Sequence, residues 1–272
     1  MAKYEIKDGV GIIPQGVTSI EDSAFWYCKS LESINIPDYV KSIERSAFWE
    51  CESLKTIHLP NGVTSIGEGA FRECESLESI NIPDGVMSIG KDAFEGCKSL
   101  ESINIPDGVT SIGKGAFREC ESLKSIYIPD GVTSIGKSAF SQCKSLESIN
   151  IPGSVTSLEE YAFSGCESMK YIVRSEKIRK ADIINLFNDK PEVYITTMPK
   201  GLSEEKKKDY FSHIEENVKR EQKEKEEKEE KRKIRQEKEE KEGNRLFGCL
   251  FIIWLIIMII ILILYFGGVL GE

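Results

Sequence analysis

Histidine is scarce in this chain of 272 residues, which contains only His58 and His213. Neither has a partner at a spacing typical of a metal site or of a catalytic pair, so we interpret both as exposed polar residues. The chain also contains no phosphate loop and no G-x-S-x-G motif. Because the usual signatures of catalysis are missing, we expect a protein that is not an enzyme and that uses no catalytic residue, metal or cofactor.

An excess of basic residues is also absent. Residues 1–174 contain 16 Lys and Arg against 25 Asp and Glu, and the remaining residues balance at 20 against 20. A surface that binds phosphate backbones needs clustered positive charge. The acidic balance therefore argues against nucleic acid as a partner.

A repeat with a period of 23 dominates the first two thirds of the chain. A period of this length is typical of a leucine-rich repeat solenoid. Three columns of apolar residues keep this spacing. They are Phe25, Phe48, Phe71, Phe94, Phe117, Phe140 and Phe163; Cys28, Cys51, Cys74, Cys97, Cys120, Cys143 and Cys166; and Leu31, Leu54, Leu77, Leu100, Leu123 and Leu146, closed by Met169.

One unit, SLESINIPDGVTSIGKGAFREC, shows what each coil contains. Leu100, Ile103 and Ile105 alternate with polar residues, which predicts a strand with one buried side. The stretch 106–108, Pro-Asp-Gly, predicts a turn in which Gly accepts a positive φ. The spacing of Ala116, Phe117 and Cys120 predicts a short helical turn. The fold class is therefore an α/β-type repeat solenoid of seven 23-residue units.

Five regions follow from these patterns. We expect an N-terminal cap hairpin at 1–13 with Asp8 and Gly9 at its turn, the solenoid at 14–174, and a C-terminal cap of helix and strand at 175–202. A Glu/Lys-rich spacer follows at 203–245. Its repeated Glu-to-Lys pairs four residues apart favour helix, but sustained apolar heptads for a coiled coil are missing.

The last region, 246–270, predicts a transmembrane helix because residues 246–271 contain no charged residue and about 20 apolar residues span a bilayer. Residues 219–245 hold 12 Lys and Arg, which places this side in the cytosol. The charged start MAKYEIKDGV is not a secretory signal. We therefore expect a single-pass membrane protein with a C-terminal anchor and a cytosolic repeat domain.

The column of seven cysteines has three interpretations. Stacked positions about 5 Å apart could be bridged, but seven is odd and the expected compartment is reducing. Zinc prefers four converging ligands, often in closely spaced pairs, which a period of 23 does not supply. Cysteine is also a small, commonly buried apolar residue. This third interpretation, cysteine as core, fits the pattern best.

The units have the form I-P-x-x-V-x-x-I-x-x-x-A-F-x-x-C-x-x-L-x-x-I over about 12–173, and this pattern resembles the BspA-like, or Treponema pallidum type, leucine-rich repeats. Small departures are Tyr39 and Ser154 in place of Gly, Leu158 in place of Ile and Met169 in place of Leu. The resemblance implies a binding module of the kind found in surface proteins linked to adhesion to host or matrix proteins. It identifies no ligand.

A candidate protein-binding face follows from the outward strand positions, which form rows of Ser or Thr and of Asn. His58 and Tyr127 interrupt the Asn row, Tyr171 interrupts the Ser/Thr row, and aromatic residues are common at binding hot spots. The candidate residues are Asn35, His58, Asn81, Asn104, Tyr127, Asn150 and Tyr171. Trp26 and Trp49 form a second candidate patch, and a Ca²⁺ row at Asp84, Asp107 and Asp130 is less favoured because the turn already explains these residues.

Two functions are consistent with these features. The main hypothesis is a non-enzymatic scaffold or adaptor that faces the cytosol, is tethered by the C-terminal helix and binds an unknown protein partner. The alternative is a cell-surface adhesin or antigen of the BspA-like kind, exposed outside the cell. The charge asymmetry around 246–271 favours the first, and the family resemblance favours the second.

Overall fold

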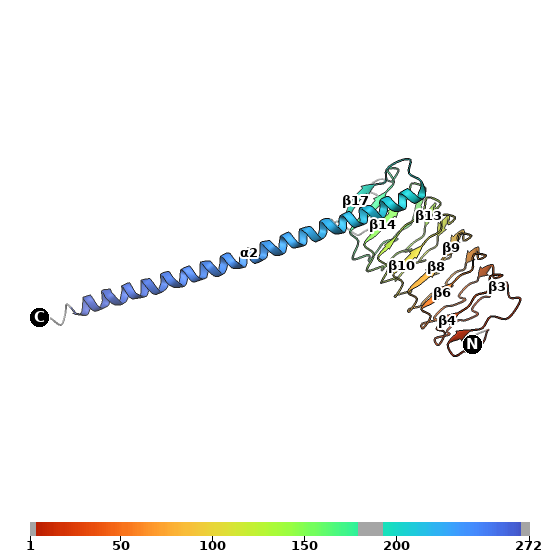
Figure 1. Ribbon diagram of the computed structural model, residues 1–272, viewed down its shortest axis with the longest axis horizontal. Coiled ribbons are helices and arrows are strands. Elements are labelled where there is room, and N and C mark those ends of the chain that lie inside the picture. Colours follow the sequence, from red (N-terminus) through yellow and green to blue (C-terminus); the bar gives the residue numbers. More distant parts are fainter. Residues whose placement is uncertain (1–3, 179–192, 268–272) are drawn as a thin grey trace. The chain divides into compact units, whose positions relative to one another are not determined.

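The computed structural model describes residues 4–178 and 193–267. The chain divides into two units, residues 1–215 and 216–272, and the first contains the repeats. The strands of the repeats follow one another in chain order through the stack (Figure 1). The helix predicted in the C-terminal cap falls largely on residues 179–192 and lies outside the described residues.

Each coil contributes two short strands, one on each of two sides of the stack, and on both sides the strands of neighbouring coils pair in parallel. The strands of the first side, which together we call the first sheet, fall into three hydrogen-bonded groups. They are β4 (Ser33–Ile34), which joins the N-terminal strands; β6 (Thr56–His58), β8 (Ser79–Asn81) and β10 (Ser102–Asn104); and β12 (Ser125–Ile126), β14 (Ser148–Ile151), β16 (Tyr171–Arg174) and β17 (Tyr194–Thr197). The second sheet comes from the T-S-I stretches, with β3 (Ser19–Ile20), β5 (Ser42–Ile43), β7 (Ser65–Ile66), β9 (Ser88–Ile89), β11 (Ser111–Ile112), β13 (Ser134–Ile135) and β15 (Ser157–Leu158).

The register of both sheets equals the sequence period. Ile103 pairs with Ile80 in the first sheet, and the two are one repeat apart in the sequence. Ile112 pairs with Ile89 in the second sheet at the same separation. The last strand, β17, continues this register with one further pairing, to β16. The solenoid therefore has about eight turns, one more than the seven units predicted.

The third side of each coil is a chain of tight turns, not the short helix predicted from Ala-Phe-x-x-Cys. Two residues per coil have left-handed φ, such as Ser23 at 58° and Tyr27 at 61°, and an α-helix requires right-handed φ throughout. The Phe25 N–H donates instead to Ala47 O of the next coil at 2.7 Å. The Tyr27 N–H donates in the same way to Trp49 O at 2.8 Å. Hydrogen bonds between coils thus replace those within a helix.

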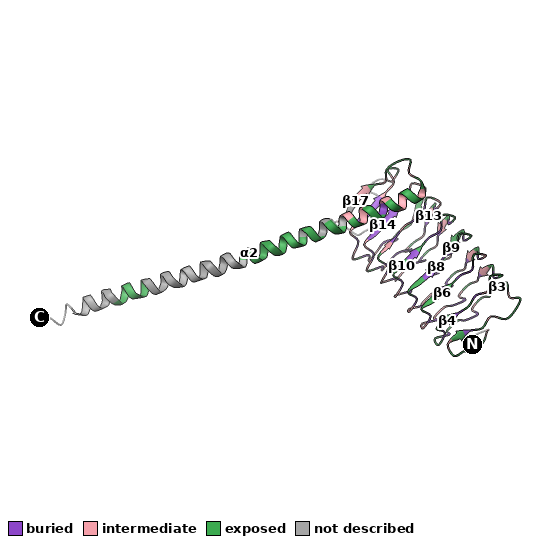
Figure 2. Cartoon of the chain, viewed as in Figure 1, coloured by how far each residue is buried: buried purple, intermediate pink, exposed green. Residues whose placement is uncertain are grey.

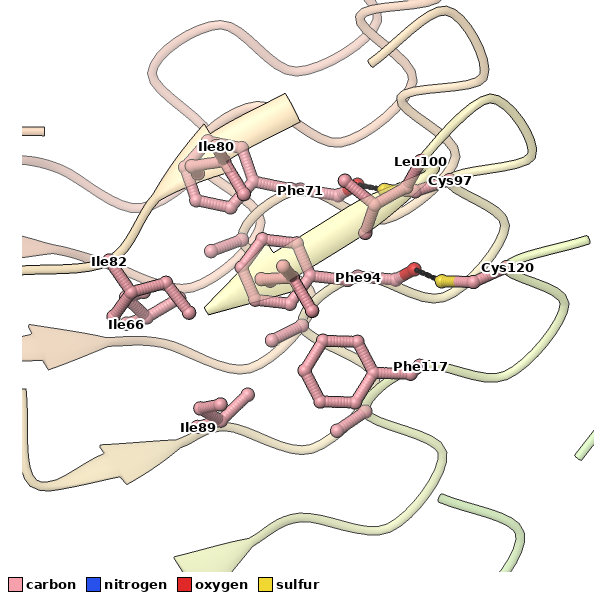
Figure 3. Packing of buried hydrophobic residues seen from close by; sticks show 14 of the residues in the cluster. Ile66, Phe71, Ile80, Ile82, Ile89, Phe94, Cys97, Leu100, Phe117 and Cys120 are labelled. Atoms are coloured by element: carbon pink, nitrogen blue, oxygen red, sulfur yellow. Dashed lines mark hydrogen bonds between the residues drawn. The ribbon is translucent and has the colours of Figure 1, made fainter. Parts of the chain in front are cut away.

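The phenylalanine column forms the centre of the stack (Figure 3). The rings of Phe71, Phe94 and Phe117 lie nearly parallel, with 5.4 Å between the centroids of each neighbouring pair, and all three are buried. Each cysteine lies beside this column, and from Cys51 onward each donates its thiol proton to a phenylalanine carbonyl of the preceding coil. Cys97 Sγ is 3.2 Å from Phe71 O, and Cys120 Sγ is 3.2 Å from Phe94 O. The interpretation of the cysteines as core agrees with this packing.

The turn after each first-sheet strand differs from the prediction in its use of glycine. In Pro106–Val109 the Val109 N–H donates to Pro106 O at 3.1 Å, so the tight turn is present. Gly131, in the same place one coil later, does not have a positive φ. A Cβ atom on Gly131 would lie 2.6 Å from Asp107 O. At Gly131 glycine is therefore favoured by the close approach of the neighbouring coil, although Tyr39 and Ser154 occupy the same place in other coils.

The two ends of the described repeats differ. β1 (Ile6–Lys7) and β2 (Val10–Gly11) form an antiparallel hairpin, with Asp8 and Gly9 at positive φ between them. β2 then pairs in parallel with β4 and so joins the stack. At the other end the helix α2 (Glu204–Gly267) follows β17.

The transmembrane helix predicted over 246–270 is not confirmed. Within the part of the chain that the structure describes, no helix combines the length and the apolar character needed to cross a membrane. In this segment the structure describes the side chains of 254–259, which are apolar and exposed.

Candidate functional site

The exposed side of the first sheet, which we call the strand face, carries the residues that the sequence singled out. In β8 the side chains of Ser79 and Asn81 are exposed, whereas Ile80 between them is buried. Because the register equals the repeat, Asn81 lies between His58 of β6 and Asn104 of β10. Identical or similar side chains therefore form rows across the coils.

The rows on the strand face are open at one end of the stack and covered at the other. Figure 2 shows this change: exposed residues appear in β6, whereas β14 is buried. The predicted residues follow the same gradient, from the exposed Asn35, His58, Asn81 and Asn104, through the half-buried Tyr127, to Asn150 and Tyr171, which are 3% and 0% exposed.

The first turns of α2 cover the C-terminal part of the strand face. Four side chains of this helix, Glu204, Lys207, Lys208 and Phe211, point to the strand face. They occupy positions i, i+3, i+4 and i+7, which share one side of a helix. We call residues 204–214 the docking segment. It belongs to the same compact unit as the repeats.

Polar contacts hold the start of the docking segment. The Tyr127 hydroxyl donates to Glu204 Oε2 at 3.2 Å. Lys207 Nζ donates to Asp130, and Lys208 Nζ donates to Asp107 Oδ1 at 3.0 Å. These two aspartates occupy the same place in consecutive P-D-G turns, so two adjacent lysines contact two adjacent coils. The aspartate row that the sequence could assign to Ca²⁺ contacts lysines at these two positions.

An aromatic contact anchors the other end of the docking segment. Phe211 is 4% exposed, and its ring centroid lies 5.9 Å from that of Tyr127 and 6.3 Å from that of Tyr171. Both distances lie in the range of favourable aromatic pairs. We call Tyr127 and Tyr171 the tyrosine clamp. Tyr127, which interrupts the Asn row, and Tyr171, which interrupts the Ser/Thr row, therefore both contact the chain's own helix.

Asn150 lies in β14, the strand between β12 and β16, and has a structural role in this structure. Its side-chain amide donates to Ile128 O at 2.6 Å and its Oδ1 accepts from Ile128 N–H at 2.5 Å. These two hydrogen bonds satisfy both backbone polar groups of Ile128, which lies just beyond the end of β12 and outside its pairing with β14. A buried amide that is satisfied in this way is not available to an external partner.

Burial raises the pKa of the Tyr127 hydroxyl, and the nearby Glu204 carboxylate adds to the increase. Burial also raises the pKa of Tyr171. Both phenols therefore remain protonated at neutral pH. Tyr127 then acts as the donor in its hydrogen bond to Glu204, which requires the neutral phenol.

Sequence reasoning missed the residues of the docking segment. The sequence predicted only a Glu/Lys-rich spacer there, whereas the structure buries Phe211 within it. The available signal was the set of residues at i, i+3, i+4 and i+7 that precedes the monotonous Glu/Lys stretch. That spacing indicates a binding side of the helix only when the facing surface carries aspartates for the two lysines and tyrosines for Phe211.

A second candidate surface lies on the turn side of the first coils, where Trp26 and Trp49 were singled out. Their ring centroids are 6.2 Å apart, and the Arg72 guanidinium lies 5.0 Å from the Trp49 ring centroid. An open groove of about 440 Å³ borders these residues and also contacts Glu68 and Asp92. Those carboxylates are paired with Lys91, so the groove has no uncompensated charge that would indicate a ligand.

The repeat cysteines are unsuited to chemistry. All seven are buried and unbridged in the described chain. Burial raises the pKa of Cys28 to about 11, and it also raises the pKa of Cys97. A thiol reacts as a thiolate, which burial disfavours. Among the described residues, no group of three or more His, Cys, Asp or Glu could hold a metal ion.

The repeats match a known family. The family model of the BspA type leucine rich repeat region matches residues 11–105 and 87–213, with six copies of the repeat. The comparison with curated proteins gives no match.

Three solved structures are similar to this chain. A leucine-rich repeat protein from Bacteroides ovatus is 32% identical, with 68% of this chain and 50% of that chain covered and a TM-score of 0.50. The Treponema pallidum leucine rich repeat protein is 34% identical, with coverages of 43% and 57% and a TM-score of 0.43. A leucine rich cell surface protein from Faecalibacterium prausnitzii is 33% identical, with coverages of 65% and 62% and a TM-score of 0.46. The matches thus cover 50–62% of the length of these proteins.

Proposed function

The chain belongs to the BspA-type leucine-rich repeat family, and from this premise we propose that it is a non-enzymatic protein-binding module that uses its strand face. One observation carries this proposal: the strand face already holds a polypeptide, the docking segment, through side-chain contacts to three coils. A protein partner then binds the open part of the same face, where His58 and Asn81 are exposed.

The chemistry of the open part suits a polypeptide surface. Amide and hydroxyl side chains such as those of Asn81 and Ser79 both donate and accept hydrogen bonds. Charged residues flank them, with Lys124 Nζ 3.0 Å from Glu101 Oε2. A polar surface of this kind provides directional contacts, and its flat, periodic form spreads them over several coils.

A pair of matched double variants tests the binding face. His58→Arg with Asn81→Arg places two long cations on the strand face, and Thr64→Arg with Met87→Arg places two on the exposed side of the second sheet. Candidate partners are obtained by photo-crosslinking from a residue introduced at position 81 and are then titrated against purified chains. We expect the first pair to weaken binding at least about tenfold, whereas the second leaves affinity unchanged. Equal effects of the two pairs would contradict the proposal.

The location of the module has two candidates. Family membership supports display at the cell surface, as an adhesin or antigen that binds host or matrix proteins. The second candidate is a cytosol-facing scaffold held by a C-terminal anchor at 246–270. It is supported by the absence of charge from 246–271 and by the 12 Lys and Arg of 219–245.

Protease accessibility separates the two locations. A tag on the N-terminus is followed during digestion of intact cells and of isolated sealed membranes. Loss of the tag from intact cells indicates surface display, which family membership favours. Survival on intact cells, with loss from sealed internal membranes, indicates the cytosolic scaffold.

A further inference from the structure

The docking segment is bound to the strand face as a separate helical ligand would be. Its anchors at i, i+3, i+4 and i+7 follow the pattern of an amphipathic helix laid in a groove. Phe211 is its buried apolar anchor, and Lys207 and Lys208 contact aspartates on two coils. The Glu204 carboxylate accepts hydrogen bonds from Tyr127 and from the backbone of Asp130, both far away in the sequence. All of these contacts join residues far apart in the sequence, so none of them requires that the two partners belong to the same chain.

A short linker joins the docking segment to the repeats. The Met198 N–H donates to Arg174 O at 2.8 Å, next to the end of β17, and α2 begins at Glu204. Between them lie Pro199 and Gly201, which has a φ of 74° and nothing within 4 Å of the place where a Cβ would be. A change of backbone direction at Gly201 meets little steric resistance.

We infer that the tyrosine clamp accepts the docking segment from a second copy of this chain, in exchange for the segment of its own chain. Each contact of the docking segment can form equally well between two molecules, because exchange of an identical element preserves its interface. Attachment to the same chain gives the internal segment an effective concentration in the millimolar range. The internal arrangement therefore prevails in dilute solution, and exchange prevails where copies are crowded or where the internal segment is impaired.

The position of the clamp limits where exchange can occur. The exposed members of the Asn row are Asn35, His58, Asn81 and Asn104, none of which has a phenol ring like those of the two tyrosines. The paired aspartates Asp107 and Asp130 flank the clamp and fix the direction of the helix through the two lysines. The site thus selects a helix that carries Lys-Lys three residues before Phe.

A complementation experiment tests this inference. One 272-residue chain carries Tyr127→Ala, which impairs the clamp but keeps the segment, and another carries Phe211→Ala, which impairs the segment but keeps the clamp. Each variant is labelled and titrated with itself and with the other by fluorescence anisotropy. We expect association of the mixture to be at least about tenfold tighter than self-association of either variant. Equal association in all three titrations would overturn the inference.

A peptide provides a second measurement that does not depend on the folding of the Tyr127→Ala chain. A labelled peptide of residues 203–217 is titrated into the Phe211→Ala chain, with the same peptide carrying Phe211→Ala as the control. We expect binding of the first peptide only, and weaker binding to wild-type chain because its own segment competes. A Lys208→Glu peptide should bind poorly to the Phe211→Ala chain and should recover when that chain also carries Asp107→Lys. Failure of the unaltered peptide to bind would contradict the inference.

The inference rests on the proposed function in that both use the strand face, but the two can fail separately. The double variant His58→Arg with Asn81→Arg alters the open coils and leaves the clamp residues in place. We expect it to bind the peptide as the unaltered receptor does. Loss of an external partner together with retention of the peptide separates the two surfaces.

Discussion

At the scale of single residues, each coil places one cysteine beside one phenylalanine, and the two are connected across coils. The thiol of Cys74 donates to Phe48 O at 3.0 Å, and that of Cys143 donates to Phe117 O at 3.1 Å. The stacked rings bury apolar surface, and the buried thiol finds an acceptor in a carbonyl oxygen that also accepts a backbone N–H, such as that of Cys51 at Phe48 O. The regular spacing of cysteine therefore follows from packing and hydrogen bonding together.

The buried thiols predict a loss of stability in alkali. The pKa is raised at six repeat cysteines, at Cys51 chiefly by its hydrogen bond with Cys74 and then by burial, and at the others chiefly by burial. These thiols stay protonated in the folded chain and ionise when it unfolds. Unfolding then releases protons, and the free energy of unfolding falls as pH rises through the unfolded pKa of about 8.5. We expect a decrease of about 1 kcal/mol per thiol between about pH 8.5 and 9.5.

Chemical denaturation of a Cys249→Ser chain at several pH values measures this slope. Cys97→Ala added to that background should reduce the slope by about one sixth, even though it lowers stability at all pH values. If the free energy of unfolding fell equally steeply with pH in both chains, burial would not raise the pKa of Cys97 as described.

The phenylalanine column predicts a large effect of one truncation. Phe94 is fully buried and stacks on Phe71 and Phe117. We expect Phe94→Ala to lower the free energy of unfolding by about 3–5 kcal/mol, because it leaves a cavity and removes two ring contacts. Tyr161→Ala, at a side chain that is 55% exposed, should change it by about 0.5 kcal/mol or less in the same denaturation assay. Similar losses for both would contradict the central position of the column.

At the scale of elements, the alternation of apolar and polar residues predicted the strands of the first sheet, whereas the short strands of the second sheet were not predicted. Ile103 and Ile105 point inward as the alternation indicated, and the paired strands are one repeat apart in the sequence. The helical turn was wrong because apolar spacing does not reveal backbone handedness. Ser23 and Tyr27 adopt left-handed φ, and hydrogen bonds to the next coil compensate for that conformation.

The candidate site was predictable only in part for a similar reason. Tyr127 and Tyr171 stood out because they interrupt the Asn row and the Ser/Thr row. The structure shows that both contact Phe211. Which segment would contact them could not be read from a Glu/Lys-rich stretch with several weak apolar positions. That choice depends on the distance between Asp107 and Asp130 on adjacent coils, which is a property of the folded stack.

The left-handed turns make a prediction at this scale. Glu50 has a φ of 58°, and the equivalent place in other coils holds Gly96 or Gly165. Left-handed backbone costs a residue with a Cβ about 1–2 kcal/mol, partly offset by the greater unfolded-state freedom of glycine. We expect Glu50→Gly to raise the free energy of unfolding by up to about 1 kcal/mol. Lys55→Gly, beside a strand and without positive φ, should lower it by about 0.5–1 kcal/mol, so destabilisation by both would refute the assignment.

At the scale of the whole molecule, the repeats form a stack in which every coil contacts its neighbours, and stability is approximately a sum over coils and interfaces. The docking segment adds contacts between Glu204 and Phe211 on one side and several coils on the other. Local unfolding of the covered coils should therefore cost more free energy than local unfolding of the open coils. The strand face is thus divided into a part that holds a helix and a part that remains available.

Hydrogen–deuterium exchange of the docking segment tests the account most directly. Amides of residues 204–214 in the 272-residue chain are compared with those of the Phe211→Ala variant, with the open strands β6 and β8 as an internal reference for intact repeats. If the strand face holds this helix, exchange of 204–214 should be at least about tenfold slower in the wild-type chain while the reference is unchanged. Equally fast exchange of 204–214 in both chains would contradict the claim that the strand face binds a polypeptide.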